Sequence, residues 1–334
     1  IGYKVPGPIA ADAALVDINL PRPVAAGYDI LVEVKAVSVN PVDYKVRNST
    51  PPADGDWKVL GWDAAGIVRE VGPDVTQFEL GDEVYYAGAI TRPGTNAEFH
   101  LVDARIVGHK PASLSWAEAA ALPLTTLTAW EAMFDRLDVA KPVPGAAEAI
   151  LIIGGAGGVG SIAVQIARQR TDLTVIATAS RPETQEWVRG LGAHHVIDHS
   201  RPLAPQIAEL GIGAPAFVFS TTHTEQHVAD IAELIAPQGR FGLIDDPKAF
   251  DIMVFKRKAV SIHHELMFTR AIYGTPDMNE QGEILDAMAA LVDDGKIRTT
   301  LTRRLSPINA ANLKTVHALI ESGAAKGKIV LEGF

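Results

Sequence analysis

The segment of the sequence with the clearest chemical potential is a glycine-rich stretch, GGAGGVG at positions 154–160. It joins an apolar run at 149–153 to an amphipathic stretch at 158–170, as expected for a strand, a turn and a helix. The spacing G-x-G-x-x-G permits a tight turn, close approach of backbone to a pyrophosphate, and close packing of the helix on the strand. The alternative is a tight strand–helix turn with no ligand. We predict a dinucleotide site that includes Gly155, Gly157, Gly158, Val159 and Gly160.

The end of the next predicted strand indicates which dinucleotide would bind. An NAD site usually has Asp or Glu about 20 residues after the glycine motif, but Ser180 and Arg181 stand here. A hydroxyl and a guanidinium suit the 2′-phosphate of NADP through charge-assisted hydrogen bonds. Two alternatives stay open. Ser180 and Glu183 have the spacing of a helix capping box, and Arg181 has the character of a solvated surface charge. We predict NADP(H) as the cofactor.

The elements that would position these residues change in character near Pro123. Before it, short alternating runs at 29–39, 64–72, 82–88 and 97–103 are typical of β-rich structure. After it, apolar strands alternate with amphipathic helices, which predicts a parallel sheet covered on both faces. The predicted strands are 149–153, 173–179, 195–198, 216–220, 240–244 and 260–266, and the predicted helices are 158–170, 182–191 and 225–235. Two helices at 282–293 and 310–322 and a strand at 328–331 complete the chain.

Composition excludes several classes of protein. The 334 residues contain no cysteine, so disulfides, thiolate nucleophiles and iron–sulfur clusters are excluded. The 30 basic and 40 acidic residues give a net charge of −10, which disfavours nucleic acid as a partner. The uncharged stretch at 149–167 carries too many glycines for a membrane helix. The chain begins at Ile1 rather than Met, so we expect residues before it, and without a visible export signal we expect a cytoplasmic location.

Several further motifs, in order along nearly the whole chain, resemble the medium-chain dehydrogenase/reductase superfamily and in particular its zinc-free quinone oxidoreductase-like branch. They are VNPVDYK at 39–45, LGWDAAG at 60–66, VG at 71–72, Phe78, GDEV at 81–84, GTNAEF at 94–99, LPLTTLTA at 122–129 and GKIVL at 327–331. The resemblance implies an α/β fold: a doubly wound parallel Rossmann sheet at 123–268, and a GroES-like β-rich catalytic domain built from 1–122 and 269–334.

The chain departs from the zinc enzymes of that superfamily at their metal ligands. Asn40 stands where they have Cys, and Trp62 and Asp63 stand where they have His and Glu. Catalytic zinc needs about three protein ligands, so the resemblance implies no metal site. Elsewhere, His223 and His227 have a ligand spacing, but polar residues beginning a helix near the cofactor are the simpler interpretation.

Without a metal, hydride transfer suits an acceptor that is already electron-poor, such as a quinone or an α,β-unsaturated carbonyl. The resemblance places Asn40, Tyr44 and Trp62 at the catalytic site. Asn40 and Tyr44 would donate hydrogen bonds to the acceptor oxygen, and Trp62 would wall the pocket. The alternatives are that Asn40 fixes a turn before Pro41 and that Tyr44 packs against the nicotinamide. Asp43 is either a base or a capping carboxylate.

The resemblance also implies further cofactor contacts, each with a structural alternative. Thr128 would touch the nicotinamide or its ribose, unless its hydroxyl bonds back within a helix. His199 would lie near the adenosine phosphate, unless it is an ordinary loop residue. Phe268 would close over the nicotinamide or belong to the core, and Lys328 would lie near the cofactor cleft or in solvent. Two residues at strand ends, Thr221 and Ile244, would border the cofactor.

Members of the family pair their last Rossmann strands, so we expect a homodimer through 260–266, with a loop covering that edge as the alternative. The expected function is an NADPH-dependent, metal-independent oxidoreductase that acts on a small-molecule quinone or enone, with no nucleic-acid or membrane partner. Two alternatives remain: an alcohol or carbonyl dehydrogenase that uses an unrecognised metal, and an NADPH-binding protein without catalysis.

Overall fold

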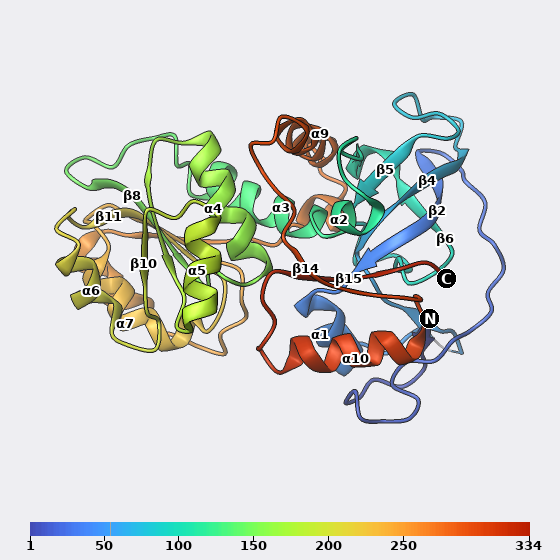
Figure 1. Ribbon diagram of the computed structural model, residues 1–334, viewed down its shortest axis with the longest axis horizontal. Coiled ribbons are helices and arrows are strands. Elements are labelled where there is room, and N and C mark those ends of the chain that lie inside the picture. Colours follow the sequence, from blue (N-terminus) through green and yellow to red (C-terminus); the bar gives the residue numbers. More distant parts are fainter. Residues whose placement is uncertain (54) are drawn as a thin grey trace. The chain divides into compact units, whose positions relative to one another are not determined.

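The structure is a computed structural model that describes residues 1–53 and 55–334, so the predicted loop at 48–57 contains one position, 54, outside the described residues. The chain forms two compact units (Figure 1). Unit 1 comprises Ile1–Leu127 and Phe268–Phe334, and unit 2 comprises Thr128–Met267. The chain therefore enters unit 2 once and leaves it once.

Unit 1 is built on a seven-stranded, mostly antiparallel sheet in the order β14-β15-β2-β4-β5-β7, with β6 paired to β2. The predicted runs at 29–39, 64–72, 82–88 and 97–103 form four of its strands. The strands are β2 (Asp29–Ser38), β4 (Asp63–Val71), β5 (Glu83–Tyr86), β6 (Phe99–Asp103), β7 (Val107–His109), β14 (Leu301–Leu305) and β15 (Lys328–Glu332). A separate pair joins β1 (Gly2–Tyr3) to β3 (Lys58–Val59).

The strand register of unit 1 brings distant parts of the sequence together. Val330 of β15 pairs antiparallel with Ser38 of β2, so Lys328, two residues before Val330, lies opposite Asn40, two residues after Ser38. Asp63 of β4 pairs with the same Ser38. Because antiparallel partners share one register, three residues far apart in sequence meet at the end of β2.

Six helices accompany this sheet. They are α1 (Pro41–Ser49), α2 (Trp116–Ala120), α3 (Pro123–Trp130), α8 (Thr269–Tyr273), α9 (Glu280–Asp293) and α10 (Ala310–Glu321), with a short 3-10 turn η1 at Ala104–Ile106. Pro41 is at the first position of α1, where the missing N–H costs nothing. Helix α3 contains the point where the chain passes from unit 1 into unit 2.

Unit 2 is a six-stranded parallel sheet in the order β10-β9-β8-β11-β12-β13, which confirms the predicted doubly wound fold. The strands are β8 (Ala147–Ile153), β9 (Thr174–Thr178), β10 (His195–Ile197), β11 (Pro215–Ser220), β12 (Arg240–Leu243) and β13 (Ser261–His264). The strand order reverses beside β8. In such sheets the ligand crevice lies at the carboxyl ends of the strands at this point.

Helices cover the central strands of unit 2, so residues of β8 and β11 are almost entirely buried. The helices are α4 (Gly158–Arg170), α5 (Pro182–Gly190), α6 (Leu203–Glu209) and α7 (Thr224–Leu234), with a π-helical segment η2 (Glu131–Arg136) and a 3-10 helix η3 (Ile252–Lys258). The uncharged stretch at 149–167 forms β8, the glycine turn and most of α4. In the described part of the chain, no helix is long and apolar enough to cross a membrane.

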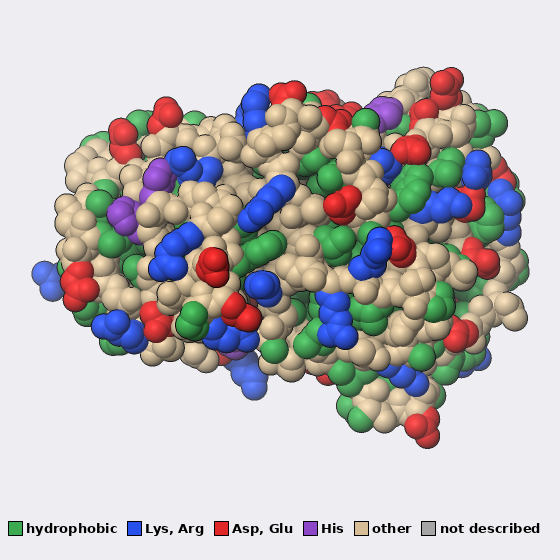
Figure 2. Space-filling model, viewed as in Figure 1, with side chains coloured by type: hydrophobic (Ala, Val, Ile, Leu, Met, Phe, Trp, Pro, Cys, Tyr) green, Lys and Arg blue, Asp and Glu red, His purple; other side chains and the backbone are tan. Residues whose placement is uncertain are grey.

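Charged side chains are spread over the molecule. On the face shown in Figure 2, acidic and basic side chains are interspersed, and neither sign gathers into one large patch. This distribution gives no positively charged surface of the kind that tracks a nucleic-acid backbone on that face.

Candidate active site

The glycine turn of unit 2 has the close contacts that the motif predicts. A Cβ atom at Gly160 would lie 2.2 Å from the carbonyl oxygen of Gly154, so only glycine lets α4 begin directly over the turn. Gly154 itself has φ +82°, and a Cβ there would lie 2.4 Å from Thr221 Oγ1. At Gly157, the N-cap of α4, the nearest atom to an added Cβ is 3.4 Å away. The turn is therefore packed tightly at Gly154 and Gly160 and roomier at Gly157.

Beside this turn, the hydroxyl group of Thr178 links the ends of the three adjacent strands β8, β9 and β10. The backbone N–H of Gly154 donates to Thr178 Oγ1 at 2.9 Å, and the same oxygen lies 3.0 Å from Nδ1 of His199. Burial lowers the pKa of His199, the charge of Asp198 opposes this, and the nearby Arg181 lowers the pKa further. The neutral imidazole is therefore anchored through Nδ1 to the residue that supports the glycine turn.

Ser180 and Arg181 stand at the start of α5. Arg181 is the N-cap residue, and its backbone N–H donates to Thr184 Oγ1 at 3.2 Å. The helix therefore begins one residue later than the capping box of Ser180 with Glu183 would require. Ser180 is half-buried, and the side chain of Arg181 is 49% exposed and 3.9 Å from the carboxylate of Glu183. A partly exposed guanidinium at this place suits an anionic ligand group.

The predicted border residues at the ends of β11 and β12 also lie near the switch point. Thr221 Oγ1 donates to the carbonyl of Ile153 at 2.8 Å, which ties the end of β11 to the end of β8. The backbone N–H of Ile244 donates to the carbonyl of Ser220 at 3.3 Å. Both Thr221 and Ile244 therefore lie at the carboxyl edge of the parallel sheet. Thr128 is the first residue of unit 2 and is buried in α3.

Unit 1 contains a buried polar cluster where the strand register brings Asn40, Asp63 and Lys328 together. The Nζ atom of Lys328 forms an ion pair with Asp63 Oδ2 at 2.9 Å and donates to Asn40 Oδ1. Asn40 Nδ2 donates to Asp63 Oδ2 at 2.7 Å. The three residues are 0–3% exposed. Lys328 is therefore not in solvent, and the orientation of the Asn40 amide is set, because its oxygen faces an ammonium and its nitrogen faces a carboxylate.

Asp63 is the centre of this cluster. Its second oxygen, Oδ1, accepts a hydrogen bond from the backbone N–H of Leu124 at 2.7 Å, so both carboxylate oxygens have partners. Such complete pairing is what a buried charge requires. From the sequence alone, Asp63 is identified only as an acidic residue at a position where the zinc enzymes have a metal ligand. Its central place in the buried cluster depends on the strand register.

Asp43 is a second buried acid next to the cluster. Its Oδ2 accepts a hydrogen bond from the backbone N–H of Asn40 at 2.8 Å, so the carboxyl group caps helix α1. Its Oδ1 is buried and has no hydrogen-bond partner. Burial raises the pKa of Asp43 to about 7, with a further increase from Asp63 and opposing effects of Lys328 and the hydrogen bond from Asn40. Asp43 thus combines the cap predicted as one alternative with a pKa near neutrality.

The aromatic residues predicted for the site occupy different environments. Trp62 is buried, its Nε1–H donates to the carbonyl of Ala89 at 3.3 Å, and its ring meets Phe268 edge to face at a centroid distance of 6.1 Å. Phe268 is itself 2% exposed. Tyr44, on α1, is half-buried. Trp62 and Phe268 therefore form one aromatic pair within unit 1.

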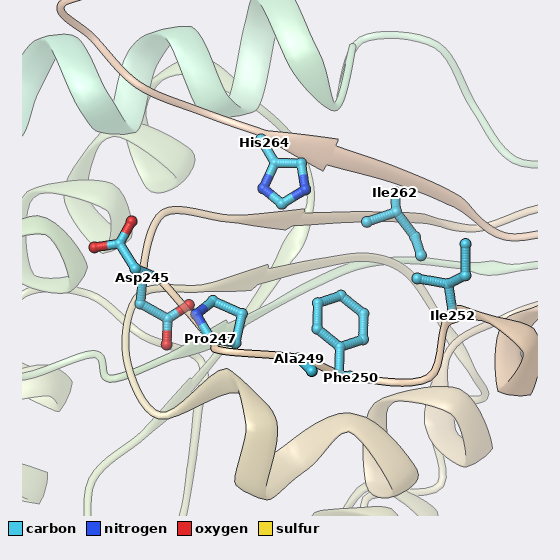
Figure 3. Close-up of a pocket in the computed structure, with 8 residues that line it drawn as sticks. Asp245, Pro247, Ala249, Phe250, Ile252, Ile262 and His264 are labelled. Carbon is cyan, nitrogen blue, oxygen red and sulfur yellow. The ribbon is translucent and has the colours of Figure 1, made fainter.

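A cavity that the sequence did not indicate opens in unit 2 beyond the ends of β12 and β13. Its volume is about 550 Å³. Phe250, Ile252 and Ile262 supply apolar surface on one side, and the neighbouring acids Asp245 and Asp246 and the ring of His264 supply polar groups (Figure 3). These residues come from an irregular segment after β12 and from the edge strand, which have no motif that a sequence reading could identify.

The candidate metal ligands are not gathered into a cluster in the described part of the chain. Among residues 1–53 and 55–334, no group of three or more His, Cys, Asp or Glu side chains could hold a metal ion. His227 of the candidate pair with His223 is buried, and burial lowers its pKa. At the positions where zinc enzymes have ligands, Asn40 and Asp63 are engaged with Lys328, and Trp62 offers no ligand atom.

Comparison with known proteins gives consistent relationships. The profile of the alcohol dehydrogenase GroES-like domain matches residues 26–130, and that of a zinc-binding dehydrogenase matches residues 191–331. A zinc-type alcohol dehydrogenase-like protein of Staphylococcus aureus is 41% identical over 315 residues, covering 93% of this chain and 92% of that protein.

Two solved structures extend this result. A putative zinc-dependent alcohol dehydrogenase of Rhizobium etli is 78% identical with a TM-score of 0.99, covering 100% of this chain and 97% of that one. A quinone oxidoreductase of Coxiella burnetii is 27% identical with a TM-score of 0.81, covering 100% and 98%. The names of these relatives therefore point to two kinds of chemistry.

Proposed function

The chain belongs to the medium-chain dehydrogenase/reductase superfamily and is an oxidoreductase, and on that premise we propose that it transfers hydride from NADPH to a quinone or an α,β-unsaturated carbonyl without a metal. The observation that carries the proposal is the buried Asn40–Asp63–Lys328 cluster. Two of its members, Asn40 and Asp63, stand at positions where the zinc enzymes have metal ligands. The positive charge in the cluster is the ammonium group of Lys328.

The chemistry of the donor set supports the proposal that no metal takes part. Zinc needs about three deprotonated or neutral ligands of the His, Cys or carboxylate type, with geometry that leaves one open position. Asp63 uses both oxygens on protein partners, and Asn40 uses its amide oxygen on Lys328. A divalent cation at this place would also face the Lys328 ammonium at close range, which is electrostatically unfavourable.

The residues of unit 1 suit stabilisation of charge on an acceptor oxygen. The cofactor, when bound, supplies the hydride. Asn40 Nδ2 has two N–H donors, of which Asp63 uses one, so the other serves the acceptor oxygen. Because Lys328 and Asp63 hold the amide in place, this donor is preorganised, and preorganised donors are the main means of stabilising developing negative charge. Tyr44 supplies a hydroxyl donor from the next turn of α1.

NADPH rather than NADH is the proposed cofactor because of the groups at the end of β9. Ser180 is followed by the exposed guanidinium of Arg181, and no acid at the end of β9 occupies the place that would bind a ribose 2′-OH. His199 lies close enough to Arg181 for the guanidinium charge to lower the pKa of its imidazole. The predicted contacts of Thr128, Thr221, Ile244 and Phe268 with the cofactor belong to the same proposal.

The test is NADPH oxidation with a quinone, an enone and an aldehyde, each measured with and without a chelator. We expect turnover of the quinone or the enone that is unchanged by the chelator. Aldehyde turnover that is lost with the chelator and restored by zinc would overturn the proposal. It would favour the alcohol dehydrogenase chemistry in the names of the Staphylococcus and Rhizobium relatives. Tight NADPH binding without turnover of any substrate would instead favour a non-catalytic role.

We also propose a homodimer through β13. This strand is at the edge of the six-stranded sheet, and Ile252 beside it is 59% exposed. An edge strand with neighbouring apolar surface is prone to pair with another chain. Light scattering at micromolar protein should give the mass of two chains, and a single monomeric mass would contradict the proposal.

A further inference from the structure

Two buried acids lie next to the points where the chain enters and leaves unit 2. The chain enters at Thr128 and leaves after Met267. Glu131 follows the entry by three residues and Glu265 precedes the exit by two residues. Their exposed fractions are 0% and 5%, although both are glutamates. Neither has a role in the proposed reaction, so their burial needs a separate explanation.

The local structure places these two side chains against each other. Glu131 begins the π-helical segment η2, in which the N–H of Leu137 donates to the carbonyl of Ala132, five residues earlier, at 2.9 Å. A π-helical turn is rare and is often found at functional positions. Glu265 follows β13, and its backbone N–H donates to the carbonyl of Leu243 at 3.0 Å, which fixes it to the sheet. The two carboxyl groups are close enough for the charge of Glu131, and a hydrogen bond between the two groups, to act on the pKa of Glu265.

This hydrogen bond requires a proton. Ionised carboxylates only accept hydrogen bonds, so two of them bond directly only when one is protonated. The basic partner is Arg136, whose Nε donates to Glu265 Oε2 at 2.8 Å and whose side chain is 34% exposed. One guanidinium balances one of the two carboxylates. Burial, and then the charge of Glu131, raise the pKa of Glu265 to about 8, while Arg136 opposes the increase.

The neighbouring titratable group His263 does not supply a compensating charge. Burial lowers the pKa of His263 on β13, and Arg240 and Arg136 lower it further. His263 is therefore neutral in the range where the glutamate pair would lose its proton. The balance at neutral pH is one guanidinium, one carboxylate and one carboxylic acid.

We propose that Glu131 and Glu265 share one proton and thereby act as a positioning pair that holds together the entry and exit segments of unit 2. The entry segment carries Thr128, and the exit segment is continuous with Phe268. Only the significance of Thr128 and Phe268 for the cofactor rests on the proposed function. The proton sharing and the linkage of the two segments stand on the described contacts.

The linkage has a defined pH dependence. The proton is bound more tightly in the folded protein, with a pKa of about 8 against an ordinary value of 4.5. Its stabilising contribution is therefore complete below about pH 4.5 and is lost as pH rises to about 8. If opening of the two segments exposes the pair to water, the opening constant increases roughly tenfold per pH unit within this window.

The test uses the full chain and amide hydrogen exchange, corrected for the intrinsic effect of pH. We expect peptides covering 128–136 and 261–267 to open roughly tenfold more per pH unit between pH 6 and 8. In Glu131→Gln, whose amide donates without a titrating proton, this dependence should disappear. Glu148→Gln is the matched control, because it removes an exposed carboxylate of the same unit and should retain the dependence.

A second measurement keeps the proposal falsifiable if Glu131→Gln folds poorly. Infrared spectra of the wild-type protein should show a protonated carboxyl band at neutral pH that disappears near pH 8, and Glu265→Gln should lack it. Exchange that is independent of pH in the wild type, or a carboxyl band that persists in both variants, would overturn the proposal.

NADPH affinity separates this inference from the proposed function. We expect the affinity of the wild type to fall above pH 8 and that of Glu131→Gln to stay constant, since the amide keeps Thr128 in place. A protein that binds no NADPH but shows the predicted exchange pattern would refute the proposed function and leave the proton-sharing pair intact. Normal NADPH affinity without the exchange pattern would refute the pair alone.

Discussion

Each unit of this chain buries two acidic side chains beside one basic side chain, but the charges are balanced differently. In unit 1, Asp63 pairs with the fully buried ammonium of Lys328, and Asp43 stays a short distance away as a helix cap. In unit 2, Glu131 and Glu265 lie close enough to influence each other's charge, and Arg136, which pairs with Glu265, is partly exposed. The charge of Asp63 is balanced by the Lys328 ammonium. In our proposal, Glu131 and Glu265 are instead held together by a shared proton.

The difference matters for how each cluster responds to pH. The Lys328 ammonium has three acceptors, the carbonyl of Val39, Asn40 Oδ1 and Asp63 Oδ2, and these contacts fix the orientation of the Asn40 amide. A shared proton is released when the solution becomes alkaline, so the segments it joins are coupled to pH. The two clusters combine buried acids with a basic side chain in both units, but we expect them to respond differently to pH.

We expect the largest change in stability when the ammonium group of Lys328 is removed. Lys328→Met leaves the fully buried Asp63 without its counter-charge, which should lower the free energy of unfolding by about 3–5 kcal/mol. Denaturant titration measures the change. The double variant Lys328→Met/Asp63→Asn removes both charges and should recover a large part of it. A single variant within about 1 kcal/mol of wild type would show that Lys328 does not balance Asp63.

We expect the exposed charge of Arg181 to affect cofactor preference more than the free energy of unfolding. Arg181→Ala removes a half-exposed guanidinium at the start of α5, so unfolding should change little. Loss of a charge-assisted hydrogen bond to the cofactor costs about 1.5–3 kcal/mol, so the preference for NADPH over NADH should fall roughly 10- to 100-fold. Ratios of kcat/KM for the two cofactors measure this. Arg189→Ala, an exposed arginine in the last turn of α5, is the control, and an unchanged ratio in Arg181→Ala would exclude the phosphate contact.

The titration of Asp43 sharpens the comparison within unit 1. Its pKa is raised from 3.8 to about 7, so its stabilising contribution is complete below about pH 4 and is lost as pH rises to about 7. Asp43→Asn keeps an oxygen that can accept from Asn40 but has no proton to lose. Between pH 5 and 7, the wild type should lose up to about 1.4 kcal/mol per pH unit relative to this variant. Parallel stability curves would mean that Asp43 is ionised throughout.

We expect the smallest change in stability when Arg136, the partner of Glu265 in unit 2, is replaced. Arg136→Met removes a partly exposed guanidinium, and the glutamate pair can become neutral by taking up a second proton, so the free energy of unfolding should change by about 1 kcal/mol. The same measurement on Lys328→Met gives the contrast directly. If Arg136→Met and Lys328→Met lowered the free energy of unfolding equally, the proposed difference between the two clusters would be contradicted.

The sequence allowed much of the fold to be predicted because its signals are local. The run of apolar residues, the glycine turn and the amphipathic stretch at 149–170 are contiguous, and β8, the turn and α4 form there. The change of character near Pro123 likewise reflects short-range alternation. The buried clusters had no such signal, since their members are separated by up to 288 residues.

The sequence alone determined that there is no thiolate chemistry, that unit 2 has a doubly wound parallel sheet, and that a glycine turn begins α4. Only the tertiary structure decided where the buried charges go. The antiparallel register of β15 on β2 puts Lys328 opposite Asn40, and the register of β4 brings Asp63 beside them. The packing of a π-helical segment against the end of β13 does the same for Glu131 and Glu265. Periodicity and spacing encode local conformation, whereas charge pairing depends on which distant segments meet.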